Sequence, residues 1–372
     1  DHVADRPCHD LRYAVDATRE VMTHTSTTAA GGQVANASML GVSRGPIHGI
    51  APGAAITMYK VCGVRGCFDS DVVAALAQAA KDGVDGITFS ISGGADPYAD
   101  AVELSFLDLY AGGTFIAASA GNSGPGAGTV DHNGPWVTTV AASTQERAFQ
   151  STLTLNGPGG TATLTGSTIT TGIASPLPIV NGASPPYSNA GCTLPAAAGS
   201  FTGELVVCTR VASDIVGRVQ RGFNVFQGGA AGMILINAVL SDTETDNHFL
   251  PTVHLEQPEG AALLAFLAAN PGATGSFPTG ASATTQGDVI TGFSSRGPGT
   301  SWIKPDVSAP GAQILGGHTP VPDDVAGGPP GNFFQAIAGT SMSSPHVAGA
   351  AALLMDPHPD WPPGQVRSAL AA

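Results

Sequence analysis

The stretch "SDVVAALAQAAKDGVDGITFSISGG" (70–94) holds the pattern that decides the fold. It predicts a helix over 70–83, with Ser70 as the N-cap and Gly83 as the C-cap. A buried strand over 84–92 follows, and two glycines end it. A helix that leads straight into a buried strand is typical of α/β folds.

The neighbouring segments repeat this order. A helix with a glycine stop is expected over 100–113, and the strand "TFIAASAGN" over 114–122. A small-residue helix begins in 21–31, and a further strand is predicted over 54–62. Alternation at this spacing indicates a parallel sheet, whose ligands bind at the carboxyl ends of the strands.

Composition excludes several classes of function. The chain has 372 residues, a net charge of −14 and only 14 Lys and Arg, so we expect no nucleic-acid partner. No apolar run reaches the roughly 18 residues of a membrane span. The ten His lack zinc-site spacing. We expect no cofactor and no metal, with a structural calcium on the acidic loop "DTETDNH" (242–248) as the weaker alternative.

The pattern of the sequence changes near residue 151. Thr and apolar residues alternate there as in antiparallel strands, and "FSSRGP" (293–298) returns to the pattern of the N-terminal part. We therefore expect a main domain made of 1–171 and 274–372, interrupted by a smaller insert over 172–273.

The five cysteines suggest two local disulfides. Cys62 and Cys67 bracket one short loop, and Cys192 and Cys208 bracket another, which fits an oxidising, exported setting. Free buried thiols are the alternative. Cys8 is left over and is expected to be unpaired.

The segment "GTSMSSPHVAG" (339–349) offers a candidate nucleophile, Ser341. A nucleophilic serine needs an accessible hydroxyl at a helix start, nearby backbone N–H groups and small neighbours that admit a carbonyl. This segment supplies all three. The alternative is a serine that only caps the helix.

Three segments together resemble the subtilases, the subtilisin-like serine proteases. They are "GTSMSSPHVAG", "ASAGNSGP" (118–125), and "FSSRGP" with "KPDVSAPG" (304–311). The resemblance runs from about Cys8 to Ala371 and is strongest to cucumisin-like plant enzymes and their bacterial relatives. It implies a subtilisin-like, doubly wound, mostly parallel sheet with an inserted, β-rich protease-associated-like domain.

The resemblance also implies roles for individual residues. Ser341 would be the nucleophile, and Asn122 with the Ser341 N–H would hold the oxyanion. Two segments would bind an extended peptide and flank its side chain. Their residues are Ser92, Gly93 and Gly94, and Ala118, Ser119, Ala120 and Gly121.

The sequence departs from the family pattern at the base and its orienting acid. The subtilase run His-Gly-Thr-His-Thr aligns with "VMTHT", which puts Val21 at the catalytic position and His24 at the second, non-catalytic histidine. The Asp segment is expected to be missing, since Asp16 is the only partial match and lies eight residues before His24. Val21 cannot accept a proton.

Two functions follow from these observations. The first is a secreted serine endopeptidase that acts on proteins or peptides through an acyl-enzyme on Ser341. The alternative is an inactive pseudo-protease that binds peptides or proteins. Neither requires a membrane or a nucleic acid, and the oligomeric state is open.

Overall fold

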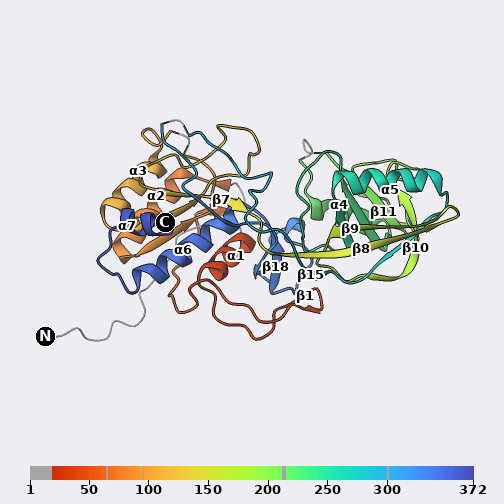
Figure 1. Ribbon diagram of the computed structural model, residues 1–372, viewed down its shortest axis with the longest axis horizontal. Coiled ribbons are helices and arrows are strands. Elements are labelled where there is room, and N and C mark those ends of the chain that lie inside the picture. The colour runs from red at the N-terminus through yellow and green to blue at the C-terminus, as the bar shows by residue number, and fades with distance from the viewer. Residues whose placement is uncertain (1–18, 64–65, 95, 212–214, 300) are drawn as a thin grey trace.

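The computed structural model describes residues 19–63, 66–94, 96–211, 215–299 and 301–372. Figure 1 shows two lobes, each built around its own sheet. The expectations for Cys8 and Asp16 fall outside the described residues.

The first lobe is built on a four-stranded, wholly parallel sheet with the order β16-β7-β6-β5. The strands are β5 (Gly86–Phe89), β6 (Phe115–Ser119), β7 (Thr138–Ser143) and β16 (Val307–Pro310), and the helices are α1 (Arg19–Ala30), α2 (Asp69–Asp82), α3 (Ala101–Ala111), α6 (Thr340–Met355) and α7 (Pro363–Leu370). The predicted parallel α/β fold is therefore confirmed.

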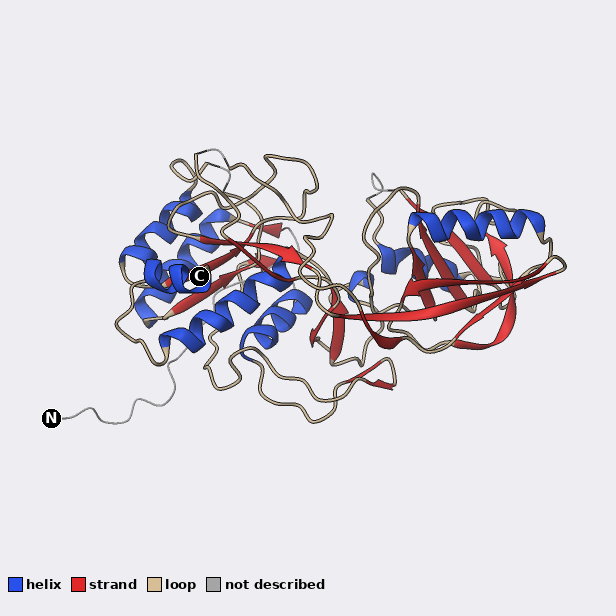
Figure 2. Cartoon of the chain, in the orientation of Figure 1, coloured by secondary structure: helices blue, strands red, loops and turns tan. Residues whose placement is uncertain are grey.

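Helices cover both faces of this sheet (Figure 2). Successive β6 residues point to opposite faces. Ile116 packs in one buried cluster with α2 and α3, and Phe115 packs in the other with α1 and α6. A strand buried on both faces has to be apolar throughout, which explains the unbroken run of small and apolar residues in β6.

Two local predictions in this lobe are wrong. The segment 54–62 forms no strand except at its end, where β3 (Cys62–Gly63) pairs with β4 (Gly66–Cys67). Its β-branched and aromatic residues find no ladder partner among the described residues, and composition alone does not make a strand. Helix α2 begins at Asp69, so its N-cap is Phe68, two residues before the predicted Ser70, whereas Gly83 is the left-handed C-cap as predicted.

The second lobe holds an eight-stranded sheet with the order β14-β10-β11-β12-β13-β9-β8-β15. The strands are β8 (Arg147–Gly157), β9 (Gly160–Ser167), β10 (Ile173–Asn181), β11 (Leu205–Arg210), β12 (Gly232–Asn237), β13 (Thr252–Leu255), β14 (Thr274–Phe277) and β15 (Ala281–Thr284), and the helices are α4 (Arg218–Gln227) and α5 (Gln257–Ala269). Strand β14 also pairs with β8, so the sheet closes on itself.

This sheet is wider than the insert expected from sequence. Strands β8, β9, β14 and β15 lie outside 172–273 and pair with one another or with strands of that segment. The hairpin of β8 and β9 is antiparallel, as the alternating Thr residues predicted. The chain leaves the first lobe near Thr144 and re-enters it near Val289. These two points lie side by side, since the Thr144 amide donates to Val289 O at 2.8 Å. The boundaries of the insert remain a prediction.

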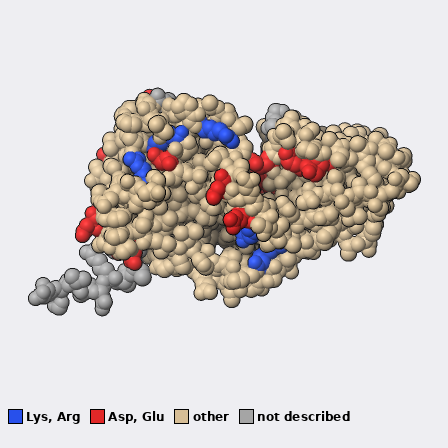
Figure 3. Space-filling model, in the orientation of Figure 1, with Lys and Arg blue, Asp and Glu red and all other residues tan. Residues whose placement is uncertain are grey.

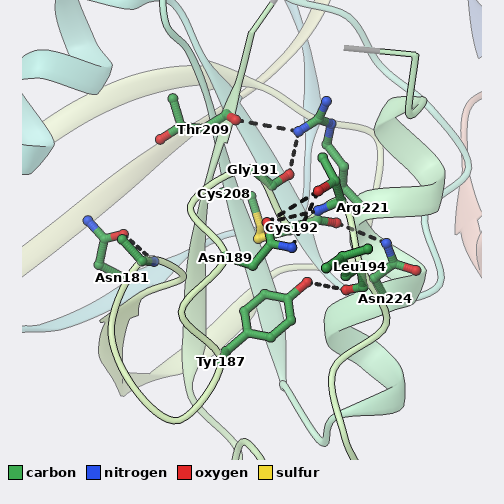
Figure 4. The surroundings of a disulfide bond; sticks show 12 residues. Asn181, Tyr187, Asn189, Gly191, Cys192, Leu194, Cys208, Thr209, Arg221 and Asn224 are labelled. Atoms are coloured by element: carbon green, nitrogen blue, oxygen red, sulfur yellow. Dashed lines mark hydrogen bonds between the residues drawn. A yellow bond between two sulfur atoms is a disulfide. The ribbon is translucent and has the colours of Figure 1, made fainter.

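Both predicted disulfides are present, Cys62–Cys67 and Cys192–Cys208. The second lies in the core of the second lobe, where the Arg221 guanidinium is fully buried beside it (Figure 4). Arg221 donates to the carbonyls of Gly191 and Thr209, so backbone oxygens satisfy the charge.

Several short elements lie between the two lobes (Figure 1). They are β1 (Ser38–Met39), β2 (Val42–Ser43), β17 (Ile314–Gly317), β18 (Phe334–Ile337) and the 3₁₀ turn η1 (Val325–Gly327). The Thr245 hydroxyl of the second lobe donates to Ala336 O in β18 at 2.9 Å. Strand β18 leads directly into α6, so this contact supports the segment that carries Ser341.

No helix among the described residues is long and apolar enough to cross a bilayer. Figure 3 shows Lys and Arg side chains scattered and interspersed with Asp and Glu over one face of the molecule.

Candidate active site

Ser341 lies in the first turn of α6 and is partly exposed. It exchanges two hydrogen bonds with Ser90, the residue after β5. The Ser341 hydroxyl donates to Ser90 O at 3.3 Å, and the Ser90 hydroxyl donates to Ser341 O at 3.1 Å. Pro345 explains the second bond, because a proline four residues on has no N–H to donate to the Ser341 carbonyl. The Ser90 hydroxyl takes the place of that missing donor.

A second serine fixes α6 above the sheet. Ser344 is fully buried; its hydroxyl donates to Ala117 O in β6 at 2.8 Å and lies 2.9 Å from the Thr88 hydroxyl in β5. The start of α6 is therefore held at the carboxyl end of two parallel strands. Ligands are expected at this edge of such a sheet.

Asn122 lies beside the start of α6. Its Oδ1 accepts hydrogen bonds from the Thr340 amide at 2.9 Å and from the Thr340 hydroxyl at 3.1 Å. These two donors identify Oδ1 as the acceptor side of the amide, which leaves Nδ2 as the donor side. The structure thus brings the two predicted catalytic residues, Asn122 and Ser341, to the same helix terminus.

The two predicted peptide-binding segments lie next to each other. Phe89 at the end of β5 pairs with Ala118 in β6, so the segments that follow leave from adjacent strands. A third segment holds them together: the amides of Asp131, His132 and Asn133 donate to Ala120 O, Gly93 O and Gly94 O at 2.9, 2.9 and 3.2 Å.

A buried pair, Glu103 and His132, supports the Ser92–Gly94 segment from inside. His132 Nδ1 lies 2.7 Å from Glu103 Oε1, and its Nε2 lies 2.7 Å from Ile91 O. Burial disfavours a charged ring, but the hydrogen bond and charge of Glu103 outweigh it and raise the pKa of His132. A side chain at Gly94 would collide with Glu103, since a Cβ there would be 2.4 Å from Glu103 Oε1.

Three further histidines of this lobe each have a ring nitrogen against a backbone carbonyl. His24 is fully buried in α1, and its Nε2 lies 2.8 Å from Ile314 O in β17. Burial lowers the pKa of His24 to about 4. His48 and His346 line a cavity of about 400 Å³ between α1 and β17, with Nδ1 of each ring against a backbone carbonyl.

Comparison with known proteins shows the family of this chain. The family model described as "Subtilase family" matches residues 22–372. The chain belongs to the subtilase family. This subtilase is 36% identical over 364 residues to subtilisin-like protease SBT1.7 of Arabidopsis thaliana, covering 94% of this chain and 47% of that protein.

Further relatives give the same result. SBT1.4 of the same plant is 37% identical over 369 residues, covering 94% of this chain and 46% of the relative. This subtilase therefore spans about half the length of the curated relatives it matches. Among solved structures, Sphericase aligns over 98% of this chain and 83% of its own, at a TM-score of 0.43 and 17% identity.

No group of three or more His, Cys, Asp and Glu side chains that could hold an ion is found in the described part of this subtilase. In the acidic loop 242–248, Asp246 accepts two hydrogen bonds from the Arg218 guanidinium, at 2.6 and 3.1 Å. Burial raises the pKa of Glu244 to about 8, and its Oε2 has no hydrogen-bond partner.

Sequence reasoning missed the residues that support this site. Ser90, Glu103 and His132 carry no motif that marks them, and Thr340 lies in "GTSMSSPHVAG" but was given no role there. Pro345 is the sequence feature that could have indicated a contact like that of Ser90. A proline inside a helix leaves the carbonyl four residues before it, here that of Ser341, without its usual N–H donor, so another group must donate to it.

Proposed function

We propose that this chain is the scaffold of a secreted subtilisin-like serine endopeptidase that hydrolyses peptide bonds through an acyl-enzyme on Ser341. The observation that carries the proposal is the shared position of Ser341 and Asn122 at the start of α6. An extended substrate would lie along two segments, Ser92–Gly94 and Ala118–Gly121. The segment 172–273 of the second lobe would act as the protease-associated-like insert, with the main domain made of 1–171 and 274–372.

The proposed chemistry begins when the Ser341 oxygen attacks the carbonyl carbon of the substrate. The negative oxygen that forms would be stabilised by Asn122 Nδ2 and by the Ser341 N–H, as in an oxyanion hole. The leaving amine needs a proton, and Ser341 must lose one. The position expected for the group that moves this proton is Val21, which cannot do so.

Val21 supports a second candidate, a pseudo-protease that binds peptides without cleaving them. It would keep the peptide-binding segments and the oxyanion donor. Both candidates place the same peptide along the same two segments. They differ only in whether the Ser341 hydroxyl is activated.

A fluorophosphonate probe distinguishes the two candidates. An activated Ser341 is phosphonylated within minutes, which intact-mass spectrometry detects as one adduct; Ser341→Ala is the control. Peptide hydrolysis is measured in parallel. Rapid single labelling with turnover supports the peptidase, whereas peptide binding with neither labelling nor turnover supports the pseudo-protease. Absence of labelling, turnover and peptide binding contradicts both.

A further inference from the structure

Asp131 lies between the two segments proposed to bind peptide. Its amide donates to Ala120 O at 2.9 Å, while the next amide, that of His132, donates to Gly93 O at 2.9 Å. His132 adopts a left-handed backbone conformation, with φ of 54°. His132 is buried with Glu103, but Asp131 is only partly buried. The two neighbours thus have different roles, one inside the protein and one at its surface.

The Asp131 carboxylate lies against the backbone that leads to Asn122. A Cβ placed on Gly121 would be 2.5 Å from Asp131 Oδ2, so only a glycine leaves room for this carboxylate. Gly121 directly precedes Asn122, the proposed oxyanion donor. Asp131 also accepts hydrogen bonds from the Ser92 hydroxyl and the Gly93 backbone, so its carboxylate touches both segments proposed to bind peptide. If a peptide binds there with its carbonyl at Asn122, the side chain of that residue would lie nearest to Asp131.

No Lys or Arg forms an ion pair with Asp131 within the described residues. Partial burial raises the pKa of Asp131, whereas His132, the Ser92 hydroxyl and the Gly93 backbone favour its charged form. A partly buried carboxylate that no Lys or Arg pairs with is a favourable partner for a cationic ligand, and it disfavours an apolar or acidic one.

We propose that Asp131 selects peptides with Lys or Arg as the residue that contributes the scissile carbonyl. This inference rests on the proposed function, because it assumes that Asn122 and Ser341 bind that carbonyl. The inference adds to the proposed function the chemical class of substrate, a peptide with a cationic side chain at that residue. The selection comes from one ion pair made by the bound peptide and from the cost of covering the carboxylate with an uncharged or negative side chain.

The test is binding, which needs no activity. Fluorescein-labelled Ala-Ala-Pro-Lys, Ala-Ala-Pro-norleucine and Ala-Ala-Pro-Glu are titrated with the whole chain, and anisotropy gives each Kd. Norleucine matches the length of lysine without its charge. We expect the lysine peptide to bind about tenfold more tightly than the norleucine peptide, and the glutamate peptide to bind most weakly. Added salt should reduce the lysine preference.

The variant Asp131→Asn keeps the shape of the side chain and removes its charge. It should abolish the lysine preference, by weakening lysine binding and strengthening norleucine binding, while Asp108→Asn, at an exposed position on α3, should keep the parent preference. Equal binding of lysine and norleucine peptides by the parent chain overturns the inference without any variant, as does a lysine preference that survives in Asp131→Asn. If no peptide binds, the peptide-binding function itself fails and the inference fails with it.

Discussion

Asn122 Oδ1 accepts two hydrogen bonds from Thr340, a residue 218 positions away in the chain. The contact fixes the orientation of the amide and leaves Nδ2 to donate to a ligand. It also connects the carboxyl end of β6 to the first turn of α6. An oxyanion donor is useful only when it is held in place before the reaction, and Thr340 provides that support.

Replacing Asn122 by Ala should slow the reaction of Ser341 with a fluorophosphonate. In serine proteases, loss of one such donor lowers the rate by about 100-fold or more. We expect a fall of that order in whatever labelling rate the parent chain shows, measured by intact mass over time. The control is Thr340→Val, which removes only the hydroxyl and should have a much smaller effect. A labelling rate that is unchanged in Asn122→Ala would show that Asn122 does not face the reacting group.

Restoring a histidine should restore activity only in part. In subtilisin, loss of the catalytic histidine alone lowers kcat by about 10⁶-fold. We expect Val21→His with Met22→Gly to raise peptide hydrolysis above that of the parent chain. The rate should stay far below that of a complete triad, because the imidazole also needs a carboxylate to orient it.

Ser341→Ala in the same background is the control and should remove the gain. If the unmodified chain already hydrolyses peptides at ordinary protease rates, Val21 does not occupy the position of the base. The search for another base would then begin with His24 and His346.

Glu244 should make the chain less stable as the pH rises. Its pKa is raised to about 8 in the fold, against the ordinary glutamate value of 4.5. Between these values the unfolded chain has lost a proton that the native chain keeps, so the free energy of unfolding falls as pH increases. The loss is about 1.4 kcal/mol per pH unit for one proton. It is complete above pH 8.

The variant Glu244→Gln removes this dependence. Relative to the parent, it should gain stability steadily from pH 5 to pH 8, as measured by urea unfolding. Glu146→Gln changes an exposed carboxyl and serves as the control, with the slope of the parent. Parallel curves for Glu244→Gln and the parent would show that Glu244 is ionised in the native state.

The two disulfides should contribute unequally to stability. Cys192 and Cys208 are 16 residues apart, and Cys62 and Cys67 are five apart. The chain-entropy treatment gives about 3 kcal/mol for the longer loop and about 2 kcal/mol for the shorter one. Double replacement by Ala should follow this order in chemical unfolding. The reverse order would show that native-state packing outweighs loop entropy here.

Local sequence patterns were sufficient for several features of this protein. The apolar runs near Ile87 and Ile116 predicted parallel strands because a strand buried on both faces must be apolar along its length. Gly83 predicted a helix end because a left-handed C-cap favours glycine. The segment around Ser341 pointed to a nucleophile, and the same alignment places Val21 at the position expected for its base.

Other features depended on the tertiary structure. The segment 54–62 has the composition of a strand, but a strand requires a neighbour to pair with. The hydrogen bonds of Ser90 to Ser341, of Asn122 to Thr340 and of Glu103 to His132 join elements that are distant in sequence. Local patterns report the propensity and burial of a segment, whereas these contacts depend on which segments the fold brings together. The sequence by itself therefore determined the kind of fold and its candidate nucleophile, and only the folded chain decided which side chains surround that nucleophile.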